Sequence, residues 1–208
     1  MLKKSFIFVF VVLAISISSF AQDSITPYNS SLKYHFRIQK KQFRSSSFFE
    51  IDSEDTYRGN IKKSSFRIRN CYDLSDKGGW CATGIKRFAS LGLFFNWSSI
   101  IDIYGVNNEW LGMIEGNILT LSKAKFSIYD REEKLIGLAY MDLQGLGITI
   151  SEPNNEAYTL ARLDRVFIPD AADYWNVTVY EPEKFDDRII RIFSAFCVDT
   201  QESFHRDH

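Results

Sequence analysis

The chain has 208 residues, of which 45% are hydrophobic and 25% are charged, and its formal net charge is −1 at pH 7. This length and composition suit a single domain with one hydrophobic core. The near-neutral charge argues against nucleic acid as the main partner, because proteins that bind nucleic acid usually carry a strong basic excess.

Residues 1–21 have the three-part form of a secretory signal peptide. Lys3 and Lys4 precede an apolar run over residues 6–17, and small residues precede a cleavage site before Gln22. The run is shorter than the ~20 apolar residues that span a bilayer, so a retained membrane anchor is the less favoured alternative. We therefore expect a secreted or periplasmic protein, and removal of the two lysines leaves a net charge of −3.

A polar leader at residues 22–31 is followed by short segments in which apolar and polar residues alternate. This period of two is typical of strands with one buried face. We count twelve such segments before Glu181-Pro182 interrupts the last. They are residues 32–39, 48–52, 56–62, 65–73, 80–88, two within each of 101–113 and 126–138, and 147–152, 157–166 and 174–180.

Two of the predicted hairpins are copies of each other. Residues 101–113 align without a gap on residues 126–138, and both read apolar-x-Ile-Tyr, a five-residue polar loop, two apolar residues and glycine. Residues 49–59 form a weaker copy with one residue fewer. A unit reused in this way needs neighbours to bury its face. Gly112 and Gly137 interrupt their strands at the same place, which indicates that another element, such as a buried helix, comes close.

The last apolar segment, Asp186–Thr200, is predicted to be that helix. At 3.6 residues per turn its apolar side chains lie on almost every side, so it must be buried almost all round. Its predicted core residues are Ile189, Ile190, Ile192, Phe193, Phe196 and Cys197.

These elements predict a mainly β fold, a twelve-stranded antiparallel closed β-barrel that encloses the C-terminal hydrophobic α-helix. Closure removes exposed strand edges and gives the helix its burial. The predicted domain covers residues 32–200, and a polar tail follows at residues 201–208.

Cys71 and Cys81 flank a predicted hairpin and form a candidate disulfide in an oxidising compartment. A tight turn at residues 77–78 would place Cys81 opposite Leu74, whereas a wider loop would bring the two cysteines together. Unbridged packing residues are the alternative.

The chain resembles the tubby C-terminal-like superfamily, which includes the LURP-one-related proteins and phospholipid scramblases. The resemblance covers residues 48–199 and is carried by the repeated hairpins, by IYDREEKLIGLAYMD at residues 128–142 and by DYWNVTVYEPEKFDDRIIRIFSAFCVD at residues 173–199. It implies a twelve-stranded barrel threaded by its C-terminal helix. Tubby domains bind phosphoinositides and scramblase-like members are associated with membranes, but no lipid-contacting motif aligns here residue by residue, and the export signal departs from most relatives.

Catalytic and metal-binding patterns are weak, and no catalytic residue, metal or cofactor is predicted. His35 lies in the first strand, while His205 and His208 lie in the tail, so no histidine pair has metal-ligand spacing. Acidic pairs at residues 132–133 and 186–187 could serve a hydrolase, but they lie at a loop and a helix start, where solvated and capping carboxylates are common.

Basic and aromatic clusters are the candidate binding features. The basic cluster, Lys62, Lys63, Arg67 and Arg69, could meet anionic head groups at about 1 kcal/mol per charge. An ordinary charged outer face is its alternative. The apolar stretch Leu91–Trp97 could insert into a membrane or partner, or could plug one end of the barrel.

We therefore expect an exported, non-enzymatic barrel that binds a membrane surface, an anionic lipid or an envelope protein. An exported hydrolase acting on lipid or envelope polymer is one alternative. A small outer-membrane barrel is another, but such barrels need lipid-facing apolar strands of about 9–11 residues. Arg67, Arg69, Lys125 and Arg162 interrupt the predicted faces.

Overall fold

The computed structural model describes residues 34–43, 46–54, 56–64, 70–88, 98–117, 125–142, 144, 146–168 and 173–206. The predicted signal peptide and polar leader lie outside the described residues, as do Arg67, Arg69 and Leu91–Trp97.

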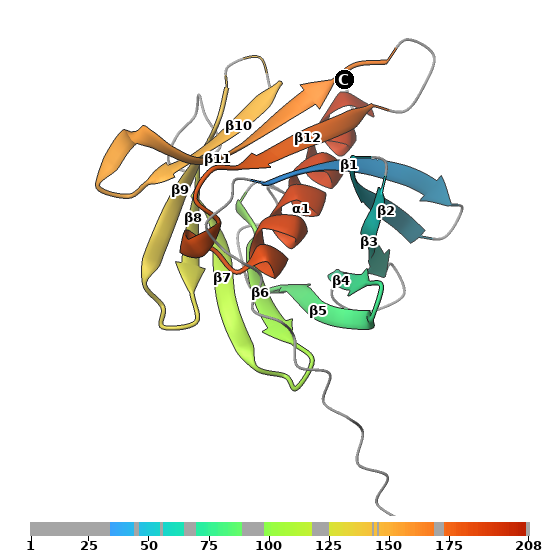
Figure 1. The fold of residues 1–208 in the computed structure, drawn as a ribbon, viewed down its shortest axis with the longest axis horizontal. Coiled ribbons are helices and arrows are strands. Elements are labelled where there is room, and N and C mark those ends of the chain that lie inside the picture. The colour runs from blue at the N-terminus through green and yellow to red at the C-terminus, as the bar shows by residue number, and fades with distance from the viewer. Residues whose placement is uncertain are drawn as a thin grey trace, which may run out of the picture.

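The described residues form twelve strands in one closed antiparallel barrel, with a single α-helix inside it (Figure 1). Each strand pairs with its neighbours in the chain, and β1 closes the ring against β12. The fold class is therefore as predicted. The strands are β1 (Tyr34–Phe43), β2 (Ser46–Ser53), β3 (Thr56–Ser64), β4 (Cys71–Asp76), β5 (Gly79–Lys86), β6 (Ile100–Gly105), β7 (Trp110–Asn117), β8 (Lys125–Asp130), β9 (Leu135–Met141), β10 (Gly147–Glu152), β11 (Asn155–Val166) and β12 (Tyr174–Val179).

A short 3₁₀ turn, η3 (Pro182–Lys184), leads into the helix α1 (Asp187–Arg206). The proline removes a backbone donor at the point where β12 must stop. All six predicted core residues of α1 are at most 2% exposed, because apolar strand residues surround the helix. The helix is longer than predicted and includes residues 201–206 of the expected tail. Within the described residues, no helix is both long and apolar enough to cross a membrane.

The repeated hairpins share one geometry. In each copy an isoleucine of the first strand pairs with the glycine that interrupts the second strand, and a β-bulge lies directly after this pair. The pairs are Ile51 with Gly59, Ile103 with Gly112, and Ile128 with Gly137. A Cβ atom on Gly112 would lie 3.1 Å from Cδ1 of Ile189 in α1, and one on Gly137 would lie 3.3 Å from the Phe185 ring. The predicted close approach of the helix is confirmed at Gly112, whereas Gly137 is approached by Ile150 of β10 and by Phe185 in the connection before α1.

The two ends of the barrel differ. The hairpin end carries the short connections that follow β2, β4, β6, β8 and β10, together with the start of α1. The loop end carries the connections that follow β1, β3, β5, β7, β9 and β11, together with the last turns of α1. In Figure 1 the C-terminus marks the loop end.

The strand register excludes the candidate disulfide between Cys71 and Cys81. The turn between β4 and β5 is tight, so Cys71 pairs with Ile85 while Cys81 lies beside Leu74. Four residues at ~3.3 Å each separate Cys81 from Ile85 along the strand, or roughly 13 Å, whereas a disulfide needs Cα atoms within ~7 Å. Both cysteines are free thiols.

Candidate functional site

The candidate functional site is a cluster of inward-facing lysines at the loop end. Lys40 lies near the end of β1 and Lys63 near the end of β3. Each follows a fully buried isoleucine, Ile38 or Ile61, by two residues. Because strand side chains alternate between the two faces, both lysines point into the barrel.

The carboxylate of Asp199, on α1, forms ion pairs with both lysines. Lys40 donates to its Oδ1 at 2.8 Å and Lys63 donates to its Oδ2 at 2.6 Å. The hydroxyl of Tyr72, on β4, donates to Oδ2 at 3.0 Å. The side chains of Lys40 and Asp199 are only 2% and 7% exposed, so this ion pair is shielded from water. Three strands are thereby tied to one point on the helix.

The electrostatics of the cluster follow from burial and charge. Burial by itself would raise the pKa of Asp199, but attraction to Lys63 and Lys40 and their hydrogen bonds together lower it. Burial raises the pKa of Tyr72 well above its ordinary value, and the charge of Asp199 adds to the rise. The pKa of Lys86, the last residue of β5, is lowered by burial and then by repulsion from Lys63. Among the described residues, three ammonium groups thus gather around one carboxylate.

A further cation lies at the loop end, on β11. Arg165 donates from Nε and Nη2 to Oδ2 of Asp173, at 2.9 and 2.6 Å, and its side chain is 9% exposed. Its guanidinium carbon lies 4.4 Å from the ring centroid of Phe167. The buried Nη1 has no hydrogen-bond partner among the residues that the structure describes. The loop end therefore also holds an ion-paired arginine, two strands away from β1 around the barrel.

The structure separates the residues of the predicted basic cluster. Lys62 and Lys63 are adjacent on β3, so Lys62 is exposed on the outer face whereas Lys63 points inward to Asp199. The two cannot belong to one face. The sequence analysis did not identify Lys40 and Asp199. The alternation along β1 places Lys40 on the inward face, and Asp199 lies within the helix predicted to be buried, so both could have been recognised as buried charges.

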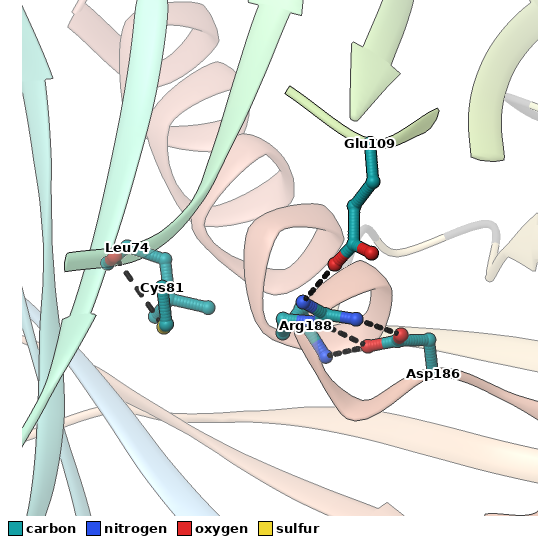
Figure 2. A network of polar contacts seen from close by, with 5 residues as sticks. All are labelled: Leu74, Cys81, Glu109, Asp186 and Arg188. Carbon is teal, nitrogen blue, oxygen red and sulfur yellow. Dashed lines mark hydrogen bonds and ion pairs between the residues drawn. The ribbon is translucent and has the colours of Figure 1, made fainter. Parts of the chain in front are cut away.

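The hairpin end holds a second polar network, around the start of α1 (Figure 2). Arg188 donates to both carboxylate oxygens of Asp186 at 2.7 to 2.9 Å, and to Oε1 of Glu109, in the β6–β7 loop, at 3.1 Å. Arg191 pairs with Asp187 one turn earlier, at 2.6 Å. These contacts hold the first turn of α1 in place. The acidic pair at residues 186–187 therefore has a structural role, as the partner of Arg188 and Arg191.

The nearby Cys81 is not suited to act as a nucleophile. Its thiol lies 3.5 Å from the backbone oxygen of Leu74, as Figure 2 shows. Burial raises its pKa to about 11, and the charge of Asp76 contributes. The reactive form of a cysteine is the thiolate, so this thiol is inert near neutral pH.

Metal ligation finds no support in the part of the chain that the structure describes, where no group of three His, Cys, Asp or Glu side chains could hold an ion. His35 is engaged through Nδ1 with the Thr178 hydroxyl at 3.0 Å.

No protein-family model matches this chain, and no curated protein matches it either.

Proposed function

We propose that the chain is an exported, non-enzymatic barrel that binds anionic lipid at a membrane surface through its loop end. The observation that carries the proposal is the uneven distribution of charge between the two ends. Basic residues stand where strands reach the loop end, at Lys40-Lys41, Lys62-Lys63, Lys86-Arg87 and Arg165. Five of them, Lys40, Lys41, Lys63, Arg87 and Arg165, form ion pairs with carboxylates. The turns of the hairpin end carry the exposed acids Glu54, Asp76, Glu109, Glu132, Glu133 and Glu183 beside fewer exposed cations, Lys77, Arg131, Lys134 and Lys184.

The topology adds a second reason. The connections between β3 and β4 and between β5 and β6 both leave and return at the loop end. The first contains Arg67 and Arg69, and the second contains the apolar stretch Leu91–Trp97. Cations near a membrane surface contribute about 1 kcal/mol each, and aromatic residues favour the membrane interface. The two binding features predicted separately thus belong to connections at one end.

The proposal includes membership of the tubby C-terminal-like superfamily. Twelve strands closed around a C-terminal helix agree with the architecture that the sequence resemblance implies. The pattern of burial favours this reading over an outer-membrane barrel. Apolar side chains face inward, while the outer face carries ion pairs such as Arg87 with Asp102 and Arg162 with Asp164. A lipid-facing barrel surface is apolar.

Vesicle co-sedimentation tests the proposal. The purified chain should pellet with phosphatidylcholine vesicles that contain phosphatidylserine or phosphatidylglycerol, but not with pure phosphatidylcholine, and added salt should weaken binding. Replacing Lys62, Arg67 and Arg69 with alanine removes about 3 kcal/mol at ~1 kcal/mol per charge, so affinity should fall on the order of 100-fold.

The matched control removes three exposed cations from the hairpin end, Lys77, Arg131 and Lys134. This variant has the same net charge as the test variant and should bind almost as well as the parent chain. An equal loss of vesicle binding in both variants would show that binding depends on net charge alone. Failure of the parent chain to pellet with the vesicles would refute lipid binding.

A further inference from the structure

A depression on the outer face of the barrel is separate from the loop-end cluster. It has a volume of about 400 Å³ and lies over β2, β1, β12 and β11, which are consecutive around the barrel. Ligand pockets generally measure ~300–1,000 Å³, so the depression can hold a small ligand. Figure 1 shows β1, β11 and β12 crossing the same side of the barrel.

The strand register builds the floor of the depression from rows of outward-facing polar side chains. In the central row, Arg37 pairs with Asp52 on one side and with Asn176 on the other, and Asn176 pairs in turn with Asp164. His35 and Thr178 form the next row towards the hairpin end. The paired side chains lie up to 143 positions apart in the chain, between His35 and Thr178, and only closure of the barrel brings them together.

Several of these side chains are held in place before any ligand arrives. The guanidinium of Arg37 lies 4.5 Å from the ring centroid of Tyr174. Asp164 accepts a hydrogen bond from Nε of Arg162 at 2.8 Å. On the rim, Asp52 directly follows the inward-facing Ile51 on β2, so its side chain faces outward into the depression. A site on strands with fixed side chains binds without a large ordering cost.

The lining selects against apolar ligands. The apolar members of the lining, Phe36 and Val177, are 5% and 0% exposed because their side chains point into the core. They contribute backbone rather than an apolar surface. The exposed groups of the depression are carboxylates, a guanidinium, an imidazole, an amide and hydroxyls.

The lining also mixes donors with acceptors and charges of both signs. Arg37 offers five N–H donors, the carboxylates of Asp52, Glu54 and Asp164 offer acceptors, and the Asn176 amide offers both. An anionic ligand would meet the carboxylates, and a cationic ligand would meet Arg37. A hydroxyl group both donates and accepts, and neighbouring hydroxyls match the paired atoms of a carboxylate or a guanidinium.

We infer that this depression binds a neutral, hydroxyl-rich ligand, namely one or two sugar units of a glycan. Arg37 and Asn176 supply the central contacts, and the carboxylates of Asp52 and Asp164 accept hydrogen bonds from the sugar hydroxyls at either side. Exposed polar sites of this kind bind through several directed hydrogen bonds rather than through burial of apolar surface.

The test is a titration of the isotopically labelled chain with defined saccharides, followed by the NMR signals of His35 and Asn176. The probes are maltose, cellobiose and diacetylchitobiose, with spermidine and inorganic phosphate as charged comparisons. The chain is made in a bacterial host, so that Asn176, which begins an Asn-Val-Thr triplet, keeps its free amide. We expect at least one saccharide to shift these signals in a saturable way.

The variant Arg37→Ala with Asn176→Ala should bind that saccharide about tenfold or more weakly, because it loses the central donors. The matched control is Arg131→Ala with Asn154→Ala, which removes the same residue types from exposed turns and should bind like the parent chain. No shift with any saccharide, equal binding by the two variants, or tighter binding of spermidine or phosphate than of every saccharide would each overturn the inference.

Discussion

At the scale of single residues, Asp199 has the largest energetic role that we can assign. It is almost fully buried, yet it accepts hydrogen bonds from two ammonium groups and a phenol on three strands. Removing one partner from a buried ion pair leaves the other charge without compensation, and this costs more than the intact pair contributes. The cluster therefore locks the second half of α1 to β1, β3 and β4, whatever it binds.

Replacing Asp199 with asparagine should lower the free energy of unfolding by about 3–5 kcal/mol, because Lys40 and Lys63 stay buried without their carboxylate. The control is Asp164→Asn, which breaks the exposed pair with Arg162 and should cost less than about 1 kcal/mol. Urea denaturation at pH 7 measures both. Similar costs for the two substitutions would contradict the assigned role.

The same pair predicts a dependence on pH. Because the pKa of Asp199 is lowered in the folded chain, its contribution is present above the ordinary carboxyl pKa of ~3.9 and is lost as the pH falls through the folded value. The stability difference between the parent chain and Asp199→Asn should therefore stay constant from pH 7 to about pH 5 and shrink as the pH falls further. A difference that stayed constant at lower pH as well would show that Asp199 is not charged in the folded state.

At the scale of elements, half of the strands of the barrel belong to one hairpin used three times, in β2–β3, β6–β7 and β8–β9. Asn108 and Glu133 hold the same place in two loops 25 residues apart, and both have φ of 58°. The loop hydrogen bonds also match, since Asn108 N donates to Gly105 O at 3.0 Å and Glu133 N donates to Asp130 O at 3.1 Å. The glycine that follows each loop lets the bulged strand approach its neighbours.

Gly112→Ala should be among the most destabilising single-methyl changes in the hairpins. Gly112 has φ of +150°, and its Cβ would lie 2.2 Å from the backbone oxygen of Tyr129 and 3.1 Å from Ile189. Backbone strain and overpacking together should lower the free energy of unfolding by roughly 3 kcal/mol or more. Gly79→Ala is the control, because Gly79 has φ of +110° but open space around its Cβ, so only strain of about 1–2 kcal/mol applies. Chemical denaturation that ranks Gly79→Ala as the more damaging change would contradict this account.

At the scale of the whole molecule, closure makes the helix and the barrel one cooperative unit. α1 contributes Ile190, Phe193 and Val198 to a core that reaches every strand of the ring, and β1 pairs with β12 to seal it. The helix cannot leave without opening the barrel. Segments of low stability should instead lie in exposed turns, such as residues 131–134.

Native-state hydrogen exchange can test this cooperativity. The amide hydrogens of residues 190–198 should exchange only through global unfolding, with the same free energy as those of β1 and β12. Those of residues 131–134 should exchange much faster. Faster exchange in the helix than in β1 would mean that α1 can loosen while the barrel stays closed.

The sequence by itself determined the elements of this protein, because strands and helices leave a local periodicity in the order of apolar residues. The alternation of two predicted twelve strands, although the fourth was expected at residues 65–73 and β4 lies at Cys71–Asp76. The 25-residue copy predicted the shared hairpin, and the all-round apolar character of Ile189–Cys197 predicted an enclosed helix. Together these features predicted a closed barrel around the helix.

Only the tertiary structure decided which residues meet. Lys40 and Asp199 are 159 residues apart, and no local pattern pairs them. The tight turn between β4 and β5 set a register that separates Cys71 from Cys81. Lys62 and Lys63 are neighbours on β3, so their side chains lie on opposite faces of the strand. The depression over β2, β1, β12 and β11 likewise joins the two ends of the chain. Register and closure set such contacts through the packing of the whole barrel, whereas periodicity reports only the face on which each side chain lies.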